Sequence, residues 1–166
     1  MNMTTFNFGN GPVPAHKHAY GGGWVADTAK VADTVYVASD AKVFDNAQVF
    51  DNAWVYGNAE VFDNAWVFGN ALVFDNALVY GNALVYGYAC VYGDAQVYGY
   101  ARVFDNAWVC GDARVSGNAR VTDNARVTDN AQIFGDVYGK AEVSGEVEED
   151  MFIEMNGKRY KLVEIE

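Results

Sequence analysis

The two histidines are the side chains best suited to chemistry in this sequence. His16 and His18 alternate in the stretch GNGPVPAHKHAYGGGW, so an extended backbone would place both on one face. Such a pair could bind a metal ion, but two ligands make an incomplete site, and no Cys or acid stands nearby in the sequence. We therefore predict a structural or solvated role for both histidines, and no metal site.

Carboxylates are plentiful, and most of the aspartates occupy one position of a repeat. Asp alternates with Gly at that position, and both residues tolerate the left-handed backbone of a sharp corner. This pattern predicts a backbone-shaping role for Asp45, Asp51, Asp63, Asp75, Asp105, Asp123 and Asp129. Carboxylates stacked on one corner, such as those of Asp45 and Asp63, could attract a cation, but such binding would be unspecific.

Cysteine usage indicates a reducing compartment. The only cysteines, Cys90 and Cys110, occupy different repeat positions and cannot build a disulfide framework. The N-terminal stretch MNMTTFNFGNGPVP has no basic segment followed by an apolar core, so we expect no signal peptide. The expected location is cytoplasmic, with association with a virion as a further possibility.

Composition and charge narrow the class of protein. The 166 residues suit one domain, and with 51% hydrophobic and 15% aromatic residues the chain is not disordered. The net charge of −11, from 22 acids and 11 bases, argues against binding to nucleic acid or to anionic membranes. Inhibition by mimicry of DNA is an alternative that this acidity leaves open.

A six-residue repeat dominates the chain and predicts its fold. From Val25 to Ile133 a valine or isoleucine falls on every sixth residue, nineteen times without interruption. Small residues follow at a fixed offset, as an unbroken series of alanines from Ala41 to Ala131. A period of six fits no helix, whose apolar stripe recurs every 3.6 residues. Self-similarity at a fixed period is typical of a solenoid.

One repeat, Ala47 to Asn52, shows how the strands and corners are expected to form. Alternation along a strand puts Ala47 and Val49 inside, and Gln48 and Phe50 outside. The pair Asp51-Asn52 then makes a corner. Three repeats give a triangular coil of eighteen residues, and successive coils stack as parallel strands about 4.8 Å apart. Corner asparagines at multiples of eighteen could form a hydrogen-bonded ladder, as with Asn46, Asn64, Asn82 and Asn118.

This pattern resembles the hexapeptide-repeat family, over roughly residues 25–148. The resemblance implies a left-handed parallel β-helix of about six to seven coils. The resemblance implies that an enzyme of this kind would be a trimeric acyltransferase with a catalytic His near a loop inserted between coils. Here the coils have no inserted loop, and neither histidine lies within them. The N-terminal segment is similar in style to uncharacterised phage and gut-bacterial members. An acyltransferase with His16 or His18 as its base is therefore only an alternative.

The fold class expected is all-β, in three parts. Residues 1–24 form an irregular arm, residues 25–148 form the β-helix, and residues 149–166 form a β-hairpin that caps the last coil. A type I′ turn at Asn156-Gly157 would pair Met155 with Lys158 and Ile153 with Tyr160. The same register pairs Glu154 with Arg159 and Met151 with Leu162.

A belt of outward aromatic side chains surrounds the middle coils and is the candidate binding or interface surface. The residues that follow the inward valines fall on three faces: Phe44, Phe62, Tyr80 and Tyr98; Phe50, Phe68, Tyr86 and Phe104; and Tyr56, Phe74 and Tyr92. Trp54, Trp66 and Trp108 directly precede inward valines. At both ends of the solenoid the outward residues turn small or polar: Ala26, Ala32 and Ala38 early, then Ser116, Thr122 and Thr128 with Arg114, Arg120 and Arg126 late. Stacking within the chain explains part of the belt. Large exposed apolar patches also mark interfaces.

These observations favour a non-catalytic solenoid without a cofactor. We expect a structural or assembly protein that forms a homo-oligomer, most simply a trimer, through the aromatic belt. The alternative that remains is a module that binds a glycan or another small ligand on the stacked rings. Ranks of Thr suited to ice binding are lacking, because outward Thr occurs only at Thr122 and Thr128.

Overall fold

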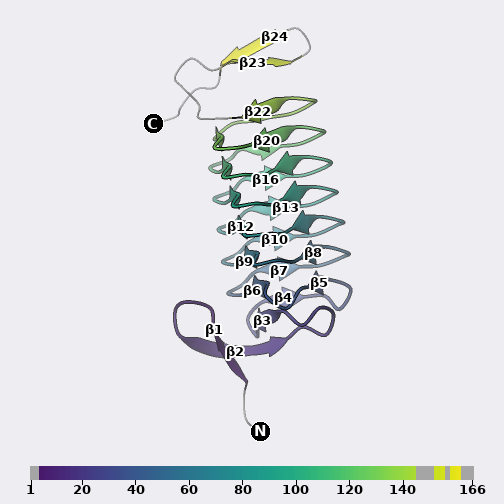
Figure 1. The fold of residues 1–166 in the computed structure, drawn as a ribbon, viewed down its shortest axis with the longest axis vertical. Coiled ribbons are helices and arrows are strands. Elements are labelled where there is room, and N and C mark those ends of the chain that lie inside the picture. Colours follow the sequence, from purple (N-terminus) through teal and green to yellow (C-terminus); the bar gives the residue numbers. More distant parts are fainter. Residues whose placement is uncertain (1–3, 145–151, 156–157, 162–166) are drawn as a thin grey trace.

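Three sheets of mainly parallel strands form a solenoid in this protein, and a separate two-stranded sheet follows near the C-terminus (Figure 1). The computed structural model describes residues 4–144, 152–155 and 158–161. These residues contain no helix, and therefore no helix long and apolar enough to cross a membrane. Each of the three sheets forms one side of the solenoid, and we name the three sides the β3 face, the β4 face and the β5 face after the first coil strand of each.

Strand bounds follow the repeat. The β3 face contains β3 (Trp24–Ala26), β6 (Lys42–Val43), β9 (Glu60–Val61), β12 (Leu78–Val79), β15 (Gln96–Val97), β18 (Arg114–Val115) and β21 (Gln132–Ile133). The β4 face contains β4 (Lys30–Val31), β7 (Gln48–Val49), β10 (Trp66–Val67), β13 (Leu84–Val85), β16 (Arg102–Val103) and β19 (Arg120–Val121). The β5 face contains β5 (Tyr36–Val37), β8 (Trp54–Val55), β11 (Leu72–Val73), β14 (Cys90–Val91), β17 (Trp108–Val109), β20 (Arg126–Thr128) and β22 (Glu142–Ser144).

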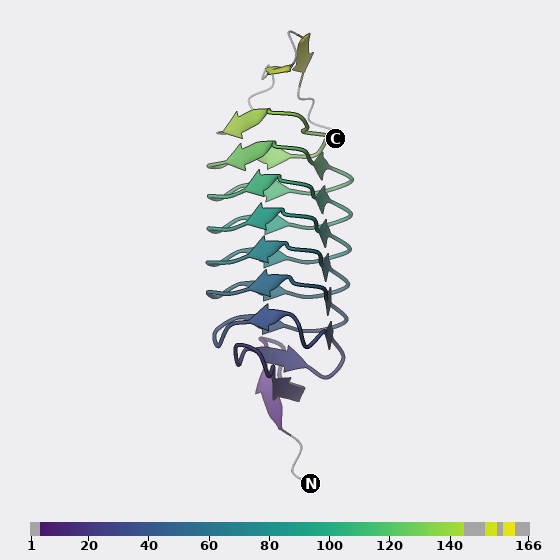
Figure 2. The same ribbon diagram turned by 90° about the vertical axis from the view of Figure 1, so that its right-hand side faces the viewer.

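Strands pair at an offset of eighteen residues, as predicted. Val67 of β10 lies beside Val49 of β7 and Val85 of β13, and all these pairs are parallel. Viewed from the side, the coils form a regular stack (Figure 2). Backbone hydrogen bonds join each coil to the next, for example from the N–H of Phe62 to the carbonyl of Val79 at 3.1 Å.

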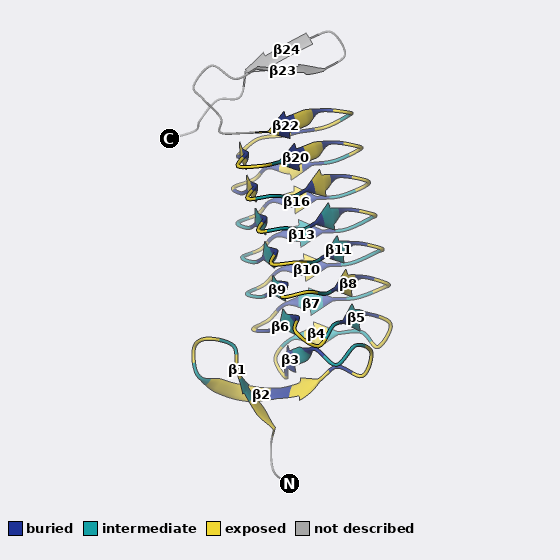
Figure 3. Ribbon diagram, viewed as in Figure 1, coloured by how far each residue is buried: buried dark blue, intermediate teal, exposed yellow. Residues whose placement is uncertain are grey.

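The core is a column of valines and alanines in the bore, dark in Figure 3. The alternation predicted for Ala47, Gln48, Val49 and Phe50 is observed, because the first and third are buried and the other two are half-buried. Burial of one valine contributes about 1.5–3 kcal/mol to stability, and each stacked coil adds three more such positions to the same column. Val31, in the first coil, is an exception to the predicted burial, since it is only partly buried.

The corners bend through left-handed residues. The seven aspartates singled out in the sequence all have positive φ, between 54° and 61°, and the glycines that alternate with them do too. Several of these carboxylates also accept a backbone N–H from the coil above, for example Asp51 from Gly69 and Asp63 from Gly81, each at 3.0 Å. The aspartates therefore shape the corner and tie it to the next coil.

An amide ladder is present, but on a different corner from the one predicted. The Asn58 side chain donates to the Asn76 carbonyl oxygen at 3.0 Å, and Asn76 donates to the carboxylate of Asp94 at 3.0 Å. Among the described residues, no side-chain bond links the predicted Asn46, Asn64 and Asn82.

The segment before the coils is more ordered than predicted. Strand β1 (Thr5–Asn7) pairs antiparallel with β2 (Pro12–Lys17), and β2 pairs antiparallel with β3 at the end of the β3 face. We call residues 4–23 the arm. The irregular arm predicted from Gly and Pro is therefore wrong over these strands, because backbone pairing to the first coil orders them.

After Ile133 the repeat shortens, as the sequence indicates. Val137 and Val143 are buried, with Val137 bridged to Val121 and β22 paired to β20. Strand β23 (Phe152–Met155) pairs antiparallel with β24 (Lys158–Lys161), and Ile153 lies opposite Tyr160 as predicted. The predicted turn at Asn156-Gly157, the pair Met151–Leu162 and the position of Val147 lie outside the described residues.

The corner glycines yield a test of the stacking. A Cβ at Gly81 (φ 70°) would lie 2.9 Å from the backbone nitrogen of Gly99, whereas a Cβ at Gly117 (φ 64°) meets nothing within 4 Å. We expect Gly81→Ala to lower the free energy of unfolding by about 2–4 kcal/mol, and Gly117→Ala by about 1–2 kcal/mol. Gly81→Asp should cost less than Gly81→Ala, because its carboxylate can accept the Gly99 N–H as Asp63 accepts that of Gly81. Chemical denaturation measures all three, and equal losses for the two alanine variants would contradict this account.

Candidate functional site

Outward rings form three continuous columns, one on each face. The β3 face carries Phe8, Phe44, Phe62, Tyr80 and Tyr98; the β4 face carries Phe50, Phe68, Tyr86 and Phe104; and the β5 face carries Tyr56, Phe74 and Tyr92. Neighbouring centroids are 4.7–5.0 Å apart. The coil spacing sets this distance. The three sets predicted from the sequence are therefore brought together as stacks.

Stacking covers most of the surface of these rings. Every ring in the columns is buried or half-buried, and Phe44 is the most enclosed. A stacked pair contributes about 0.5–1.5 kcal/mol beyond its burial. The columns thus stabilise the coils from outside, and their ring faces are not free for a ligand except at the ends. Phe8, which completes one column from the arm, was missed in the sequence because it lies outside the repeat.

Tryptophans present more open surface than the columns do. Trp54, Trp66 and Trp108 are 43%, 40% and 40% exposed. They occupy the position before the inward valine, where side chains point outward beside the columns. Trp108 also receives the Arg126 guanidinium over its ring, 4.9 Å from the centroid.

The three faces differ in charge at the position before the inward valine. The β3 face carries an ion pair between Lys42 and Glu60 at 2.7 Å, and Arg114 further along. The β4 face begins with Lys30 and ends with Arg102 and Arg120. The β5 face carries Tyr36, Trp54, Leu72, Cys90 and Trp108 in succession, without a charge from β5 to β17.

The second outward position on the β5 face is uncharged as well. Ala38, Tyr56, Phe74, Tyr92 and Cys110 follow the inward valines of the same five strands. Charge begins only at Arg126 on β20. Sequence reasoning treated the aromatic belt as one surface around the coil and missed this difference, although taking every eighteenth residue from Tyr36 would have shown it.

Both cysteines lie on the β5 face, as free thiols beside Tyr92. A hydrogen bond with the Cys110 side chain, together with burial, raises the pKa of Tyr92 to about 12. Burial raises the pKa of the Cys90 thiol above its usual value. The apolar surrounding, which disfavours a negative charge, accounts for the Cys90 shift and adds to the effect of the hydrogen bond at Tyr92.

The histidines do not act as a pair. Nε2 of the buried His18 lies 2.9 Å from the carbonyl oxygen of Val35, which fixes the arm against the first coil. Exposed His16 has its Nδ1 2.8 Å from a carboxylate oxygen of Asp27, a partner that the sequence did not indicate. Within the described ranges, no group of three or more His, Cys, Asp or Glu could hold a metal ion.

The raised pKa of Tyr92, caused first by its hydrogen bond with Cys110 and then by burial, predicts an alkaline limit to stability. The pKa of Tyr92 is raised from 10.0 to about 12, so the unfolded chain loses this proton first. The stabilisation linked to Tyr92 is therefore complete below about pH 10 and is lost as the pH rises towards about 12. Ultraviolet titration of phenolate should show a late step that Tyr92→Phe removes and that Cys110→Ala moves to lower pH. A Cys110→Ala profile identical to that of the original protein would refute the role of the thiol.

Comparison with known proteins supports the repeat architecture. The model of the YdcK beta solenoid repeat family matches three consecutive segments, residues 77–93, 95–111 and 113–129. The matches begin at Ala77, Ala95 and Ala113, so each spans nearly one coil, and together they cover under a third of the chain. No curated protein and no solved structure matches the chain. The chain is thus a β-solenoid repeat protein, similar over these coils to the YdcK repeats.

Proposed function

We propose that this protein is a non-catalytic assembly module that associates with copies of itself through the β5 face. The observation that carries the proposal is the absence of charge from the outward positions of β5, β8, β11, β14 and β17, although both other faces carry charges at these positions. Exposed apolar surface of this extent is typical of an interface.

Charge favours contact at this face over the others. The chain has a net charge of −11, so two copies repel each other at long range. Contact through the β5 face buries no carboxylate and no ammonium group from the five strands, and therefore avoids the desolvation of unpaired charges. Arg126 and Glu142, at one end of the same sheet, would lie at the polar rim.

Area is adequate for a specific contact. Seven strands about 4.8 Å apart and about five residues wide give a face of roughly 30 Å by 15 Å. A face-to-face pair would cover roughly 900 Å² in flat projection with the rim strands β20 and β22 included, and roughly 700 Å² from the five uncharged strands alone. Side-chain relief adds to both values, and the larger one approaches the roughly 1,000 Å² of small specific interfaces.

Symmetry of the assembly follows from how many faces take part. One uncharged face packs most directly on the same face of a second copy about a twofold axis. The trimer expected from the sequence instead needs contacts around a threefold axis, which would involve the corners beside the β5 face. The mass of the particle distinguishes the two.

The handedness, the family kinship, the origin and the role of the hairpin are also part of this proposal. We infer left-handed winding and hexapeptide-repeat kinship from the resemblance of the repeat, with a phage-related origin as the setting, and the hairpin β23–β24 as a cap over the last coil. Free thiols at Cys90 and Cys110 support a reducing compartment. Burial of His18 and its contact with the Val35 carbonyl support a non-catalytic role for that histidine.

Two matched tryptophans test the assignment of the face. Trp54 on the β5 face and Trp66 on the β4 face occupy the same repeat position and are almost equally exposed. We expect the original protein to sediment as a multiple of 18.2 kDa at micromolar concentration. Trp54→Glu should dissociate it at least tenfold more readily, because a carboxylate would be buried in the contact, whereas Trp66→Glu should not. A monomeric original protein would rule out self-assembly, and equal effects of the two variants would show that another face is used.

The thiol of Cys90 yields an independent prediction. Cys90 is only partly exposed and lies in the middle of the β5 face, on β14. In a Cys110→Ser background, alkylation of Cys90 by N-ethylmaleimide should be at least tenfold slower in the assembled protein than in the Trp54→Glu monomer. Trp54 lies two strands away from Cys90, so this substitution does not alter the surroundings of the thiol within one chain. Equal rates in the two proteins would show that the β5 face stays open.

A further inference from the structure

The first coil has no ring directly after its inward valines, and the arm covers this position on two of the three faces. Ala26, Ala32 and Ala38 hold the positions that aromatic residues hold in later coils. On the β3 face the ring of Phe8 lies under Phe44, with centroids 4.9 Å apart, and Ala26 is buried. On the β5 face the backbone of Gly22 bridges Ala38 and the Tyr20 ring packs edge-on to Tyr36, so the arm covers Ala38 without placing a ring under Tyr56. The arm therefore completes two of the three sides.

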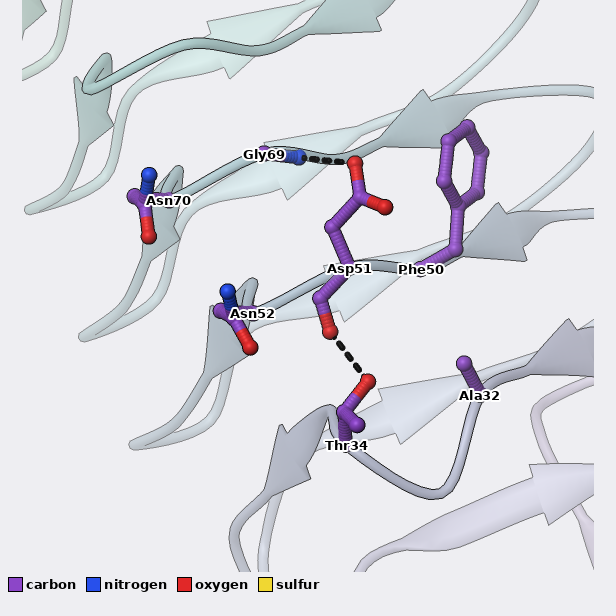
Figure 4. A pocket seen from close by; sticks show the side chains of 7 residues that line it. All are labelled: Ala32, Thr34, Phe50, Asp51, Asn52, Gly69 and Asn70. Carbon is purple, nitrogen blue, oxygen red and sulfur yellow. Dashed lines mark hydrogen bonds between the residues drawn. The ribbon is translucent and has the colours of Figure 1, made fainter.

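On the β4 face the same position is open. Two hollows of about 600 and 480 Å³ adjoin Ala32 and Phe50. In Figure 4, Ala32 and Thr34 come from the first coil, and Phe50 and Asp51 from the next. Among the described residues, no ring stacks on Phe50 from the side of Ala32, so this column ends uncovered.

Backbone groups at this edge are also left unpaired. Val25 pairs with His16 across the β2–β3 ladder. Val37 donates its N–H to the Tyr20 carbonyl at 3.0 Å and accepts the Gly23 N–H at 2.9 Å. Val31 is the equivalent residue of β4, which pairs only with β7, and no described residue supplies the corresponding bonds on its other side. An unpaired strand edge of this kind is a template for a further strand.

A free cation marks the same edge. Lys30 is exposed and forms no ion pair with any described residue. Lys42, at the same repeat position on the β3 face, pairs with Glu60 of the adjoining strand at 2.7 Å. An acidic residue on a strand added beside β4 would complete the same cross-strand pair with Lys30.

We propose that this edge binds an extended peptide segment of a partner protein. The segment adds a strand beside β4 through the N–H and carbonyl of Val31, pairs an acidic side chain with Lys30, and places an aromatic ring over Ala32 against Phe50. Main-chain bonds with alternate side-chain contacts are the general means by which sheet edges bind peptides. The arm provides the intramolecular example on the neighbouring face. This site is separate from the β5 face and does not depend on self-assembly.

Short blocked peptides test the proposal. The probes are acetylated and amidated Thr-Glu-Val-Phe-Thr and its reverse, Thr-Phe-Val-Glu-Thr, for the two strand directions. One of them should shift the amide signals of Val31, Ala32 and Phe50 in a nuclear magnetic resonance titration of the full chain, and should slow hydrogen exchange at the Val31 N–H. Replacing Phe by Ala in that peptide should weaken binding at least tenfold, because both ring stacking and apolar burial are lost. Replacing Glu by Gln should weaken it a few-fold.

Two protein variants distinguish specific binding at this site from nonspecific binding to apolar surface. Ala32→Phe fills the open place with the chain's own ring and should abolish binding. Thr128→Phe introduces the same side chain at the same repeat position, on β20 at the other end of the β5 face, and should leave binding unchanged. Failure of both peptides to bind, or binding that survives Ala32→Phe, would overturn the proposal. Methyl glucoside or N-acetylglucosamine shifting the same amides while the peptides do not would identify a saccharide site instead.

Discussion

Pairing between coils at a fixed offset of eighteen residues is the constraint on which the rest of this structure depends. Each coil must present its backbone groups where the coil above can bond them, so every coil needs three corners at the same places. The corner residue must adopt a left-handed backbone and leave room for the next corner above it. Gly meets both demands by lacking a side chain, and Asp meets them by accepting the N–H above it. The near-identity of the repeats follows from this constraint.

The repeats differ from one another mainly at their outward positions, because the inward positions must hold Val, Ile or Ala. The residue after each inward valine mostly joins a ring column, which is largely covered by its own neighbours. The residue before the valine stays more open and varies freely among Trp, Leu, Lys, Glu and Arg. Differences between faces therefore arise at this second position. Here one face is uncharged over five successive strands, from β5 to β17, while the others carry charge, without any change in the backbone.

The fold could be predicted because each repeat obeys one rule and the rule is repeated many times. The burial of Val61, the ring column through Phe62 and the left-handed corner at Asp63 all follow from the spacing. The arm could not be predicted in this way. Its contacts, such as Phe8 on Phe44 and His16 with Asp27, each occur once and depend on how the chain folds back on the first coil. The amide ladder was assigned to the wrong corner because all three corners carry Asn at the same offset, and the spacing does not distinguish them.

Because the coils contact only their neighbours, the length of this protein can change only in whole steps. Eighteen residues added or removed between two corners keep every side chain above its counterpart, and alter the height of the stack by about 4.8 Å. Six or twelve residues would keep the valines inward but would shift every later side chain to another face, and a number that is not a multiple of six would turn inward valines outward or place a corner in the middle of a side. The height of the solenoid is therefore adjustable in units of one coil. Evolution or design can set the distance between its two ends in increments of one coil, without altering what either end contacts.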